Sequence, residues 1–253
     1  MRLKDKVAIV TGGAVGIGMT LAVGLAKEGA HVVVADITDK TDEVVKAVTD
    51  LGRKCLPVKV DISKRAEVQQ MVDRAMAEFG KIDILVNNAA IYPFAPFLEC
   101  TDEMWNQVVA VCLNGTFLCS QIVGREMAKK KYGKIINIAS TQGLLGIPLT
   151  SPYAAAKGAV VALTREMATE LSPIGINVNC IAPGLTMTAH AMSAMPPEMA
   201  GYLGSVSPIR RLGKQDDYVG IVVYLSSDES SYATGAIFCI DGGLGSSMLV
   251  PAG

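Results

Sequence analysis

The sequence has few aromatic residues and only two histidines. Of its 253 residues, 5% are Phe, Trp or Tyr. A Ser-His-Asp hydrolase would need His31 or His190, and His31 opens an apolar run typical of a buried strand. The six cysteines are scattered, without a C-x-x-C pair or a nearby His cluster. They indicate buried thiols of a cytosolic protein rather than a disulfide framework or a metal site.

An excess of charge of one sign is also missing. The net charge is -1, which gives no reason to expect nucleic acid or an anionic membrane surface as a partner. The chain runs into a strand after a short polar segment, without a signal-peptide pattern, and no apolar run is long enough to cross a bilayer. We therefore expect a cytoplasmic protein with no nucleic-acid or membrane partner.

Apolar residues, in contrast, make up 50% of the chain, enough for a large core in one domain of residues 1–253. Strands that are apolar throughout and alternate with helices predict a parallel sheet covered on both faces. The expected fold is α/β: a Rossmann doubly wound sheet of about seven strands. We expect strands at 7–10, 31–35, 54–60, 82–86, 135–138, 177–181 and 236–240, and helices at 19–28, 42–51, 64–79, about 101–130, 152–171 and 215–225.

Glycines follow the first expected strand where a helix begins, in the run Thr11-Gly-Gly-Ala-Val-Gly-Ile-Gly18. Gly12, Gly16 and Gly18 let the backbone turn tightly and approach a ligand closely. The helix N-terminus then offers free N–H groups and the positive end of its dipole to a pyrophosphate. The alternative is a plain glycine-rich turn, but the strand and helix that the motif needs are present on either side.

Asp36 ends the second expected strand, 18 residues after Gly18. A carboxylate there can accept both hydroxyl groups of an adenosine ribose and repels a 2′-phosphate, which favours NAD over NADP. The alternative role is a helix cap. Asp61, at the end of the third strand, has two open interpretations: contact with the adenine edge, or a cap formed with Ser63.

A third feature is the stretch from Ser140 to Lys157. Tyr153 and Lys157 are four residues apart in an Ala-rich run, so a helix places them on one face. A nearby ammonium lowers the pKa of a phenol, and Ser140 can hold a substrate oxygen, so the three can move a proton on or off an alcohol. On its own, the pair also fits a half-buried Tyr beside a solvated Lys.

Taken together, these motifs resemble the short-chain dehydrogenase/reductase family along nearly the whole chain. The matching residues are the 11–18 run, Asp61, Asn87-Asn88-Ala89, Asn114, Ser140, Tyr153-x-x-x-Lys157 and Pro183-Gly184 with Thr188. One departure is Ala90, where the family usually has Gly. The resemblance implies metal-independent hydride transfer, with Tyr153 as proton donor and acceptor.

The resemblance also implies roles for individual residues. Ser140 would position the reacting oxygen, Lys157 would bind the nicotinamide ribose, Asn114 would hold a relay water, and Thr188 would contact the carboxamide. The residues expected at the cofactor are Gly12, Gly16, Ile17, Gly18, Asp36, Asp61, Ile62, Asn88, Ala89, Tyr153, Lys157, Pro183, Gly184, Thr186 and Thr188. Those expected at the substrate are Ser140, Gln142, Tyr92, Leu144 and Met192.

The segment 91–97, Ile-Tyr-Pro-Phe-Ala-Pro-Phe, is similar to secondary-alcohol dehydrogenases of the 1-phenylethanol type. It supplies apolar side chains with almost no Lys or Arg, and an unpaired charge in such a pocket is costly. We therefore expect a neutral, apolar or aromatic secondary alcohol and its ketone. The alternatives are a 3-oxoacyl reductase, which mostly uses NADPH and so conflicts with Asp36, and a non-catalytic NAD-binding regulatory protein.

Residues 189–207 form an expected lid that is rich in Met and contains His190. Arg210 and Arg211 follow it and resemble a structural turn of the family. The family is usually a homotetramer, formed through the Tyr-Lys helix and the last strand.

Overall fold

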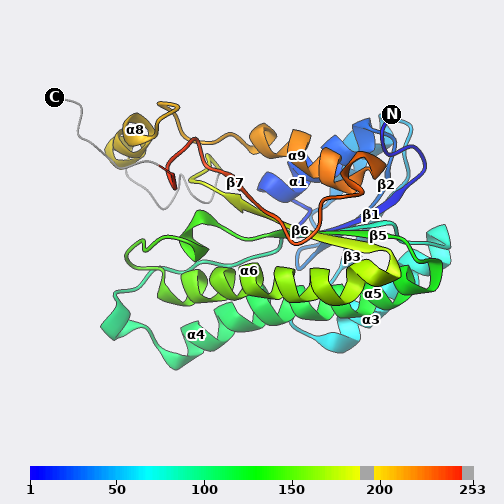
Figure 1. Ribbon diagram of the computed structural model, residues 1–253, viewed down its shortest axis with the longest axis horizontal. Coiled ribbons are helices and arrows are strands. Elements are labelled where there is room, and N and C mark those ends of the chain that lie inside the picture. The colour runs from blue at the N-terminus through cyan, green and yellow to red at the C-terminus, as the bar shows by residue number, and fades with distance from the viewer. Residues whose placement is uncertain (189–196, 247–253) are drawn as a thin grey trace.

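The computed structural model describes residues 1–188 and 197–246. A seven-stranded parallel sheet forms its centre, in the order β3-β2-β1-β4-β5-β6-β7. The predicted fold class is therefore confirmed, and every expected strand is present (Figure 1). The strands are β1 Val7–Thr11, β2 His31–Asp36, β3 Cys55–Lys59, β4 Ile84–Asn87, β5 Gly133–Ile138, β6 Ile176–Pro183 and β7 Ile237–Ile240.

Helices cover the sheet on both faces (Figure 1). Their bounds are α1 Gly16–Lys27, α2 Asp42–Thr49, α3 Arg65–Phe79, α4 Asp102–Val108, α5 Thr116–Lys130, α6 Ser151–Leu171, α8 Pro197–Val206 and α9 Val219–Ser226. One apolar cluster joins the sheet to α1, α2 and α9, and a second joins it to α3, α5 and α6. The strands are buried because each face of the sheet packs against one of these helix layers.

Local sequence signals set several helix ends. The α3 helix stops at Gly80, whose φ of +70° is left-handed. Thr101 caps α4, because its hydroxyl accepts a hydrogen bond from the Met104 N–H at 3.2 Å. Pro152 lies in the first turn of α6, where a missing N–H costs nothing.

The long helix expected over 101–130 is interrupted. A π-helical turn, η2 (Val109–Gly115), joins α4 to α5. The continuous stretch Asp102–Lys130 is long and apolar enough to cross a membrane by length and composition alone, but 56% of its most apolar window is buried in the fold. Such burial is typical of a core helix. The π turn matters for the site, because it changes which residues of this helix face inward.

The functional residues gather at one edge of the sheet. In an open parallel sheet, ligands bind beyond the carboxyl ends of the strands, where the strand order reverses. That point lies between β1 and β4, the two central neighbours whose connections run in opposite directions. The glycine run follows β1, Asn87 ends β4, Ser140 follows β5 and Gly184 follows β6.

Candidate active site

The glycine turn is built closely against the end of β4. Gly12 and Gly16 have φ values of +61° and +60°, which side chains rarely tolerate. A Cβ at Gly18 would lie 1.9 Å from the Gly12 carbonyl oxygen, whereas a Cβ at Gly16 would meet no atom within 4 Å. Gly18 is therefore required for packing, and Gly16 leaves open space above the turn.

The same turn is held by side chains from its neighbours. The Asn88 Nδ2 donates to the carbonyl oxygens of Thr11 and Gly12 at 3.0 and 3.1 Å. The Thr11 hydroxyl accepts from the N–H groups of Asn88 and Ala89 at 3.0 and 3.1 Å. In this structure Asn88 and Ala89 thus fix the shape of the turn.

The Asp36 carboxylate lies beside the turn. It accepts hydrogen bonds from the N–H of Ala14 at 3.0 Å and of Thr38 at 3.2 Å. The α1 helix begins at Gly16 without a side-chain cap and without an acidic residue in its first turn. Free N–H groups, open space above Gly16 and an adjacent carboxylate fit a dinucleotide, with its diphosphate at the helix and its ribose at Asp36.

In the turn before α3, a helix without a side-chain cap, Asp61 pairs with Ser63. Its Oδ1 accepts from the N–H and the hydroxyl of Ser63, at 3.0 and 2.6 Å. The hydrogen bonds to Ser63 and the nearby Lys64 lower the pKa of Asp61 despite partial burial. The adjacent Ile62 is buried in the core, against Gly115, and Ile17 is a partly buried residue of α1.

Tyr153, Lys157 and Ser140 come together as predicted. The Lys157 Nζ lies 5.5 Å from the centroid of the Tyr153 ring, and it donates to the Ile138 carbonyl at 2.6 Å. Ser140 accepts from the Gln142 N–H at 3.1 Å, and its hydroxyl is hydrogen-bonded to Tyr153. Lys157 is 2% exposed, so its charge is held inside the protein.

The ionisation of this cluster differs from the prediction. Burial raises the pKa of Tyr153, and the neighbouring Cys112 and Tyr92 raise it further, while the hydrogen bond with Ser140 lowers it. Burial also lowers the pKa of Lys157. The expected lowering of the Tyr153 pKa is therefore not found in the protein without ligands, because the loss of water outweighs the hydrogen bond with Ser140.

Asn114 lies apart from the buried face of its helix. Its side chain is exposed on the π turn, whereas Cys112, two residues earlier, is fully buried beside Tyr153. A signal for this was present in the sequence. Val108, Cys112, Thr116 and Cys119 follow the apolar period of a helix, and Asn114 lies outside that stripe.

Two segments, residues 91–97 and the loop 144–149, form the surface where we expect the substrate, called the substrate wall below. The Tyr92 ring lies 5.5 Å from the Tyr153 ring and makes an edge contact with Phe94 at 6.0 Å. The Ala95 N–H donates to the Leu149 carbonyl at 2.9 Å, which joins this segment to the loop after η3 (Thr141–Gly143). That loop exposes Leu144, Leu145 and Ile147 beside Gln142 of η3.

The turn after β6 lies next to β7. The Gly184 N–H donates to the Ile240 carbonyl at 3.0 Å, and Pro183 accepts from the Thr141 hydroxyl at 3.2 Å. The Thr186 hydroxyl is hydrogen-bonded to the Tyr218 hydroxyl and so is engaged within the fold. Thr188 is hydrogen-bonded to Tyr92, which brings it to the substrate wall. Met192 and His190 lie outside the described residues.

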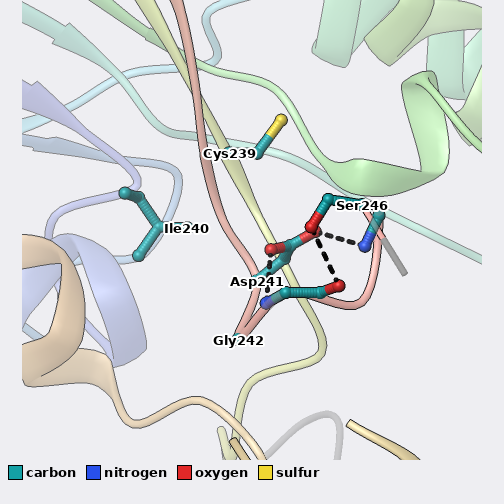
Figure 2. Close-up of a pocket in the computed structure, with 7 residues that line it drawn as sticks. Cys239, Ile240, Asp241, Gly242 and Ser246 are labelled. Carbon is teal, nitrogen blue, oxygen red and sulfur yellow. Dashed lines mark hydrogen bonds between the residues drawn. The ribbon is translucent and has the colours of Figure 1, made fainter. Parts of the chain in front are cut away.

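Two cavities flank this edge. One of about 450 Å³ lies past β7, where the Asp241 carboxylate accepts hydrogen bonds from Gly243 and Gly245 (Figure 2). A Cβ at Gly245 would lie 3.7 Å from Leu145, so this cavity adjoins the substrate wall. The other, of about 420 Å³, lies between α8 and a basic turn; its lining includes Met187, Gly204, Arg210, Arg211 and Lys214.

All six cysteines are free thiols. Cys112, Cys119 and Cys180 are buried as expected. The prediction of buried thiols is wrong for Cys239, which is exposed in the cavity past β7 (Figure 2), and holds only in part for the half-buried Cys55 and Cys100. Within the described residues, no group of three or more His, Cys, Asp or Glu side chains is arranged to hold a metal ion.

Comparisons with known proteins agree with this fold. Residues 12–245 match the family model described as Enoyl-(Acyl carrier protein) reductase. The chain belongs to the short-chain dehydrogenase/reductase family, whose members are oxidoreductases that use NAD or NADP.

Curated relatives span nearly the full chain. The cis-4-hydroxycyclohexanecarboxylate dehydrogenase of Sinomonas cyclohexanicum is 38% identical, over 94% of this chain and 96% of its own. A 3-oxoacyl-[acyl-carrier-protein] reductase of Thermotoga maritima is also 38% identical, over 96% of this chain and 99% of its own.

Solved structures are similarly close. Levodione reductase superposes with a TM-score of 0.95 at 34% identity, over 98% of this chain and 100% of its own. NAD⁺-bound xylitol dehydrogenase has a TM-score of 0.92 at 31% identity, over 96% of this chain and 100% of its own.

Proposed function

We propose that the protein is an NAD-dependent dehydrogenase that interconverts a neutral, apolar or aromatic secondary alcohol and its ketone. One observation carries the proposal: the Ser140, Tyr153 and Lys157 cluster lies beside the aromatic Tyr92–Phe94 pair, which is joined to the exposed apolar loop at 144–149. Such a wall buries an apolar substrate body and leaves only its reacting oxygen for the polar cluster.

In the oxidation, the Ser140 hydroxyl would hold the alcohol oxygen, and Tyr153 would take its proton as general base. The buried Lys157 ammonium would favour the phenolate form of Tyr153 and donate to the cofactor ribose. When bound, the nicotinamide cofactor supplies the hydride acceptor, or the donor in the reverse direction. The protein also keeps water away from the reacting groups. On the side of Tyr153 that faces the core, buried residues of η2 and α6 do this.

NAD rather than NADP is proposed from Asp36. Its carboxylate lies beside the glycine turn, held by two backbone N–H groups. A 2′-phosphate brought to this place would face a negative charge. The NAD⁺-bound state of the related xylitol dehydrogenase is consistent with this choice.

The test follows NADH absorbance while the purified protein oxidises 1-phenylethanol or a cyclic alcohol, compared with a 3-hydroxy acid and its thioester. We expect the higher kcat/KM for the neutral alcohols. The control is Tyr153→Phe, which should lose roughly 10²- to 10⁴-fold in rate while still binding NAD. A higher kcat/KM for the acid or thioester would contradict the proposed substrate class, and wild-type turnover by Tyr153→Phe would contradict the mechanism.

A second candidate function is reduction of a 3-oxoacyl thioester. The basic cavity lined by Arg210, Arg211 and Lys214 favours it, since a carrier-bound or CoA substrate is anionic. Arg211, however, is already paired with Asp217 at 2.6 Å, and the Arg210 Nη1 donates to the Ser205 carbonyl. These contacts agree with the structural turn expected for this segment, so we rank this function second.

We further propose that the enzyme works as a cytoplasmic homotetramer on a free small molecule. Large apolar side chains are exposed close together in the sequence at and before α4: Phe97 at 75%, Leu98 at 94% and Trp105 at 42%. Exposed apolar area of this kind is typical of a surface covered by another subunit. Sedimentation of the purified protein tests the proposal, and a monomer at micromolar concentration would contradict it.

A further inference from the structure

A cavity of about 420 Å³ lies between α8 and the turn at residues 210–214, called the basic turn below. The helix lies at one end of the molecule (Figure 1). It packs closely on the turn at Gly204, where a Cβ would lie 3.5 Å from the Leu212 nitrogen. Cavities of this size hold small organic molecules, so the lining of this one indicates which kind of molecule fits.

Much of the lining is small or apolar. The residues of this kind that border the cavity are Met187, Ala200, Gly201, Gly204 and Leu212. A Cβ at Gly201 would meet no described atom within 4 Å, so the backbone of α8 is open to an occupant there. The uncharged part of a ligand can therefore lie against this helix.

The charged part of the lining is basic. Arg210, Arg211 and Lys214 border the cavity, and among the described residues no Asp or Glu does so. Arg211 is already neutralised, because its two Nη atoms donate to the Asp217 carboxylate at 2.6 and 2.9 Å. Arg210 and Lys214, in contrast, form no ion pair with any residue that the structure describes. Two positive charges thus remain for a ligand.

Arg210 adopts an unusual backbone conformation. Its φ is +58°, in the left-handed region that favours glycine. Its Nη1 donates to the Ser205 carbonyl in the last turn of α8, which holds the guanidinium beside the cavity. A guanidinium has five N–H donors, so others remain for a ligand. A strained arginine at the border of a cavity is consistent with a binding role for its side chain.

We propose that this cavity binds a small organic anion. Arg210 and Lys214 hold its phosphate or carboxylate group, and its uncharged body lies against α8, Met187 and Leu212. The planar guanidinium can donate two parallel hydrogen bonds to such a group, and the ammonium adds a point charge. The site goes beyond the proposed function, because the proposed substrate is neutral and reacts at Tyr153.

Occupation of the cavity should stabilise the fold. Met187 is joined to the basic turn, since its N–H donates to the Gly213 carbonyl at 2.9 Å. Its carbonyl accepts from the Gln215 Nε2 at 3.4 Å, and the Gln215 Oε1 accepts from the Thr20 hydroxyl of α1 at 2.8 Å. A ligand between Met187, α8 and the basic turn therefore bridges three segments, and its binding can be measured as a rise in Tm.

The test is thermal unfolding with phenyl phosphate or benzoate, each compared with sodium chloride at the same ionic strength. A ligand at about five times its Kd raises Tm by about 2–4 °C for a chain of this length. We expect such a rise for the wild-type protein, and the larger of the two rises shows whether phosphate or carboxylate is preferred. Arg210→Gly and Lys214→Gln should each lose most of it. A wild-type Tm no higher than with sodium chloride would overturn the proposal.

The matched control is Lys131→Gly. Lys131 is also exposed, has a φ of +52° and follows α5, at the amino ends of the strands. Each glycine relieves a left-handed backbone and removes one positive charge, but only Arg210→Gly should lose the rise in Tm caused by phenyl phosphate. A full rise for Arg210→Gly, or an equal loss in both variants, would overturn the proposal. Lys214→Gln keeps the backbone of the turn, so it decides the result if Arg210→Gly does not fold.

The anion is either a free molecule or the charged end of a larger substrate. The kcat/KM of Arg210→Gly for a neutral alcohol and for a 3-hydroxy acid separates the two sources. A loss confined to the acid makes the anion part of the substrate, and wild-type values for both make it a free molecule; either result agrees with the site. An equal loss with both would place Arg210 at the reaction itself and overturn the proposal. The Tm measurement needs neither NAD nor turnover, so the proposed function can fail while the site stands.

Discussion

The glycine turn offers the sharpest test of where a dinucleotide binds. Alanine at Gly16 would meet no atom within 4 Å, but would keep a φ of +60°. The left-handed backbone costs roughly 1–2 kcal/mol, and the reduced freedom of the unfolded chain offsets about 0.4–1 kcal/mol of it. We therefore expect Gly16→Ala to lower the free energy of unfolding by about 1 kcal/mol, which lowers Tm by about 2–4 °C.

Gly18→Ala is the matched comparison. Its new methyl group would lie 1.9 Å from the Gly12 carbonyl oxygen and 2.6 Å from the Asn88 Nδ2. Since backbone cannot yield as a side-chain end does, the turn itself must move. We expect a loss of stability clearly larger than that of Gly16→Ala, together with a loss of cofactor binding.

The assay is thermal unfolding with and without NAD. A ligand at 100 times its Kd stabilises the folded state by about 2.7 kcal/mol. We expect NAD to raise the Tm of the wild-type protein and to leave that of Gly16→Ala unchanged, because the methyl group fills the space where the diphosphate would lie. A full NAD-induced rise in Tm for Gly16→Ala would refute this placement of the diphosphate.

Three further outcomes are expected. Asp36→Ala should weaken NAD binding and narrow the ratio of kcat/KM between NAD and NADP, whereas efficient use of NADP by the wild-type protein would contradict the role of Asp36. Asn114→Ala should lower kcat/KM, because its side chain is expected to hold a water that relays the proton, and activity equal to that of the wild type would contradict this role. Burial raises the pKa of Asp83, but hydrogen bonds from the Val7 N–H and Lys130 outweigh it and hold the pKa below its ordinary value. The stability from Asp83 is thus present above about pH 4 and lost as the pH falls through its folded pKa. In urea unfolding, Asp83→Asn should be less stable than the wild type at pH 7, with a difference that shrinks in acid; a difference constant with pH would contradict this account.

Most of the fold follows from local patterns in the sequence. The run at 31–35 predicts β2, which spans His31–Asp36, because a strand buried on both faces must be apolar throughout. The same edge of the sheet then collects Asp36, Ser140 and the glycine turn, since each follows a parallel strand. Topology alone therefore brings together most of the predicted site, and the spacing of Tyr153 and Lys157 on α6 adds the rest.

Local sequence patterns could not predict the π turn. Helix signals at Thr101 and Lys130 are those of one continuous helix, and no residue between them marks a change of hydrogen-bond pattern. The last residue of the π turn, Gly115, lies against Ile62 so closely that a Cβ there would approach within 2.6 Å. The family motif assigns a role to Asn114, and the apolar stripe of the same helix carries the buried Cys112.

The sign of the Tyr153 shift shows what spacing leaves undetermined. An i, i+4 pair fixes which residues are neighbours, but the pKa of each depends on the water that remains around it. Lys157 is 2% exposed and donates a hydrogen bond to the Ile138 carbonyl, so part of its interaction is with the backbone rather than with Tyr153. Tyr153 is partly buried, with a thiol and a second phenol beside it. In the free protein, burial thus raises the pKa of Tyr153 and lowers that of Lys157, and polar groups that enter with the ligands would oppose both shifts.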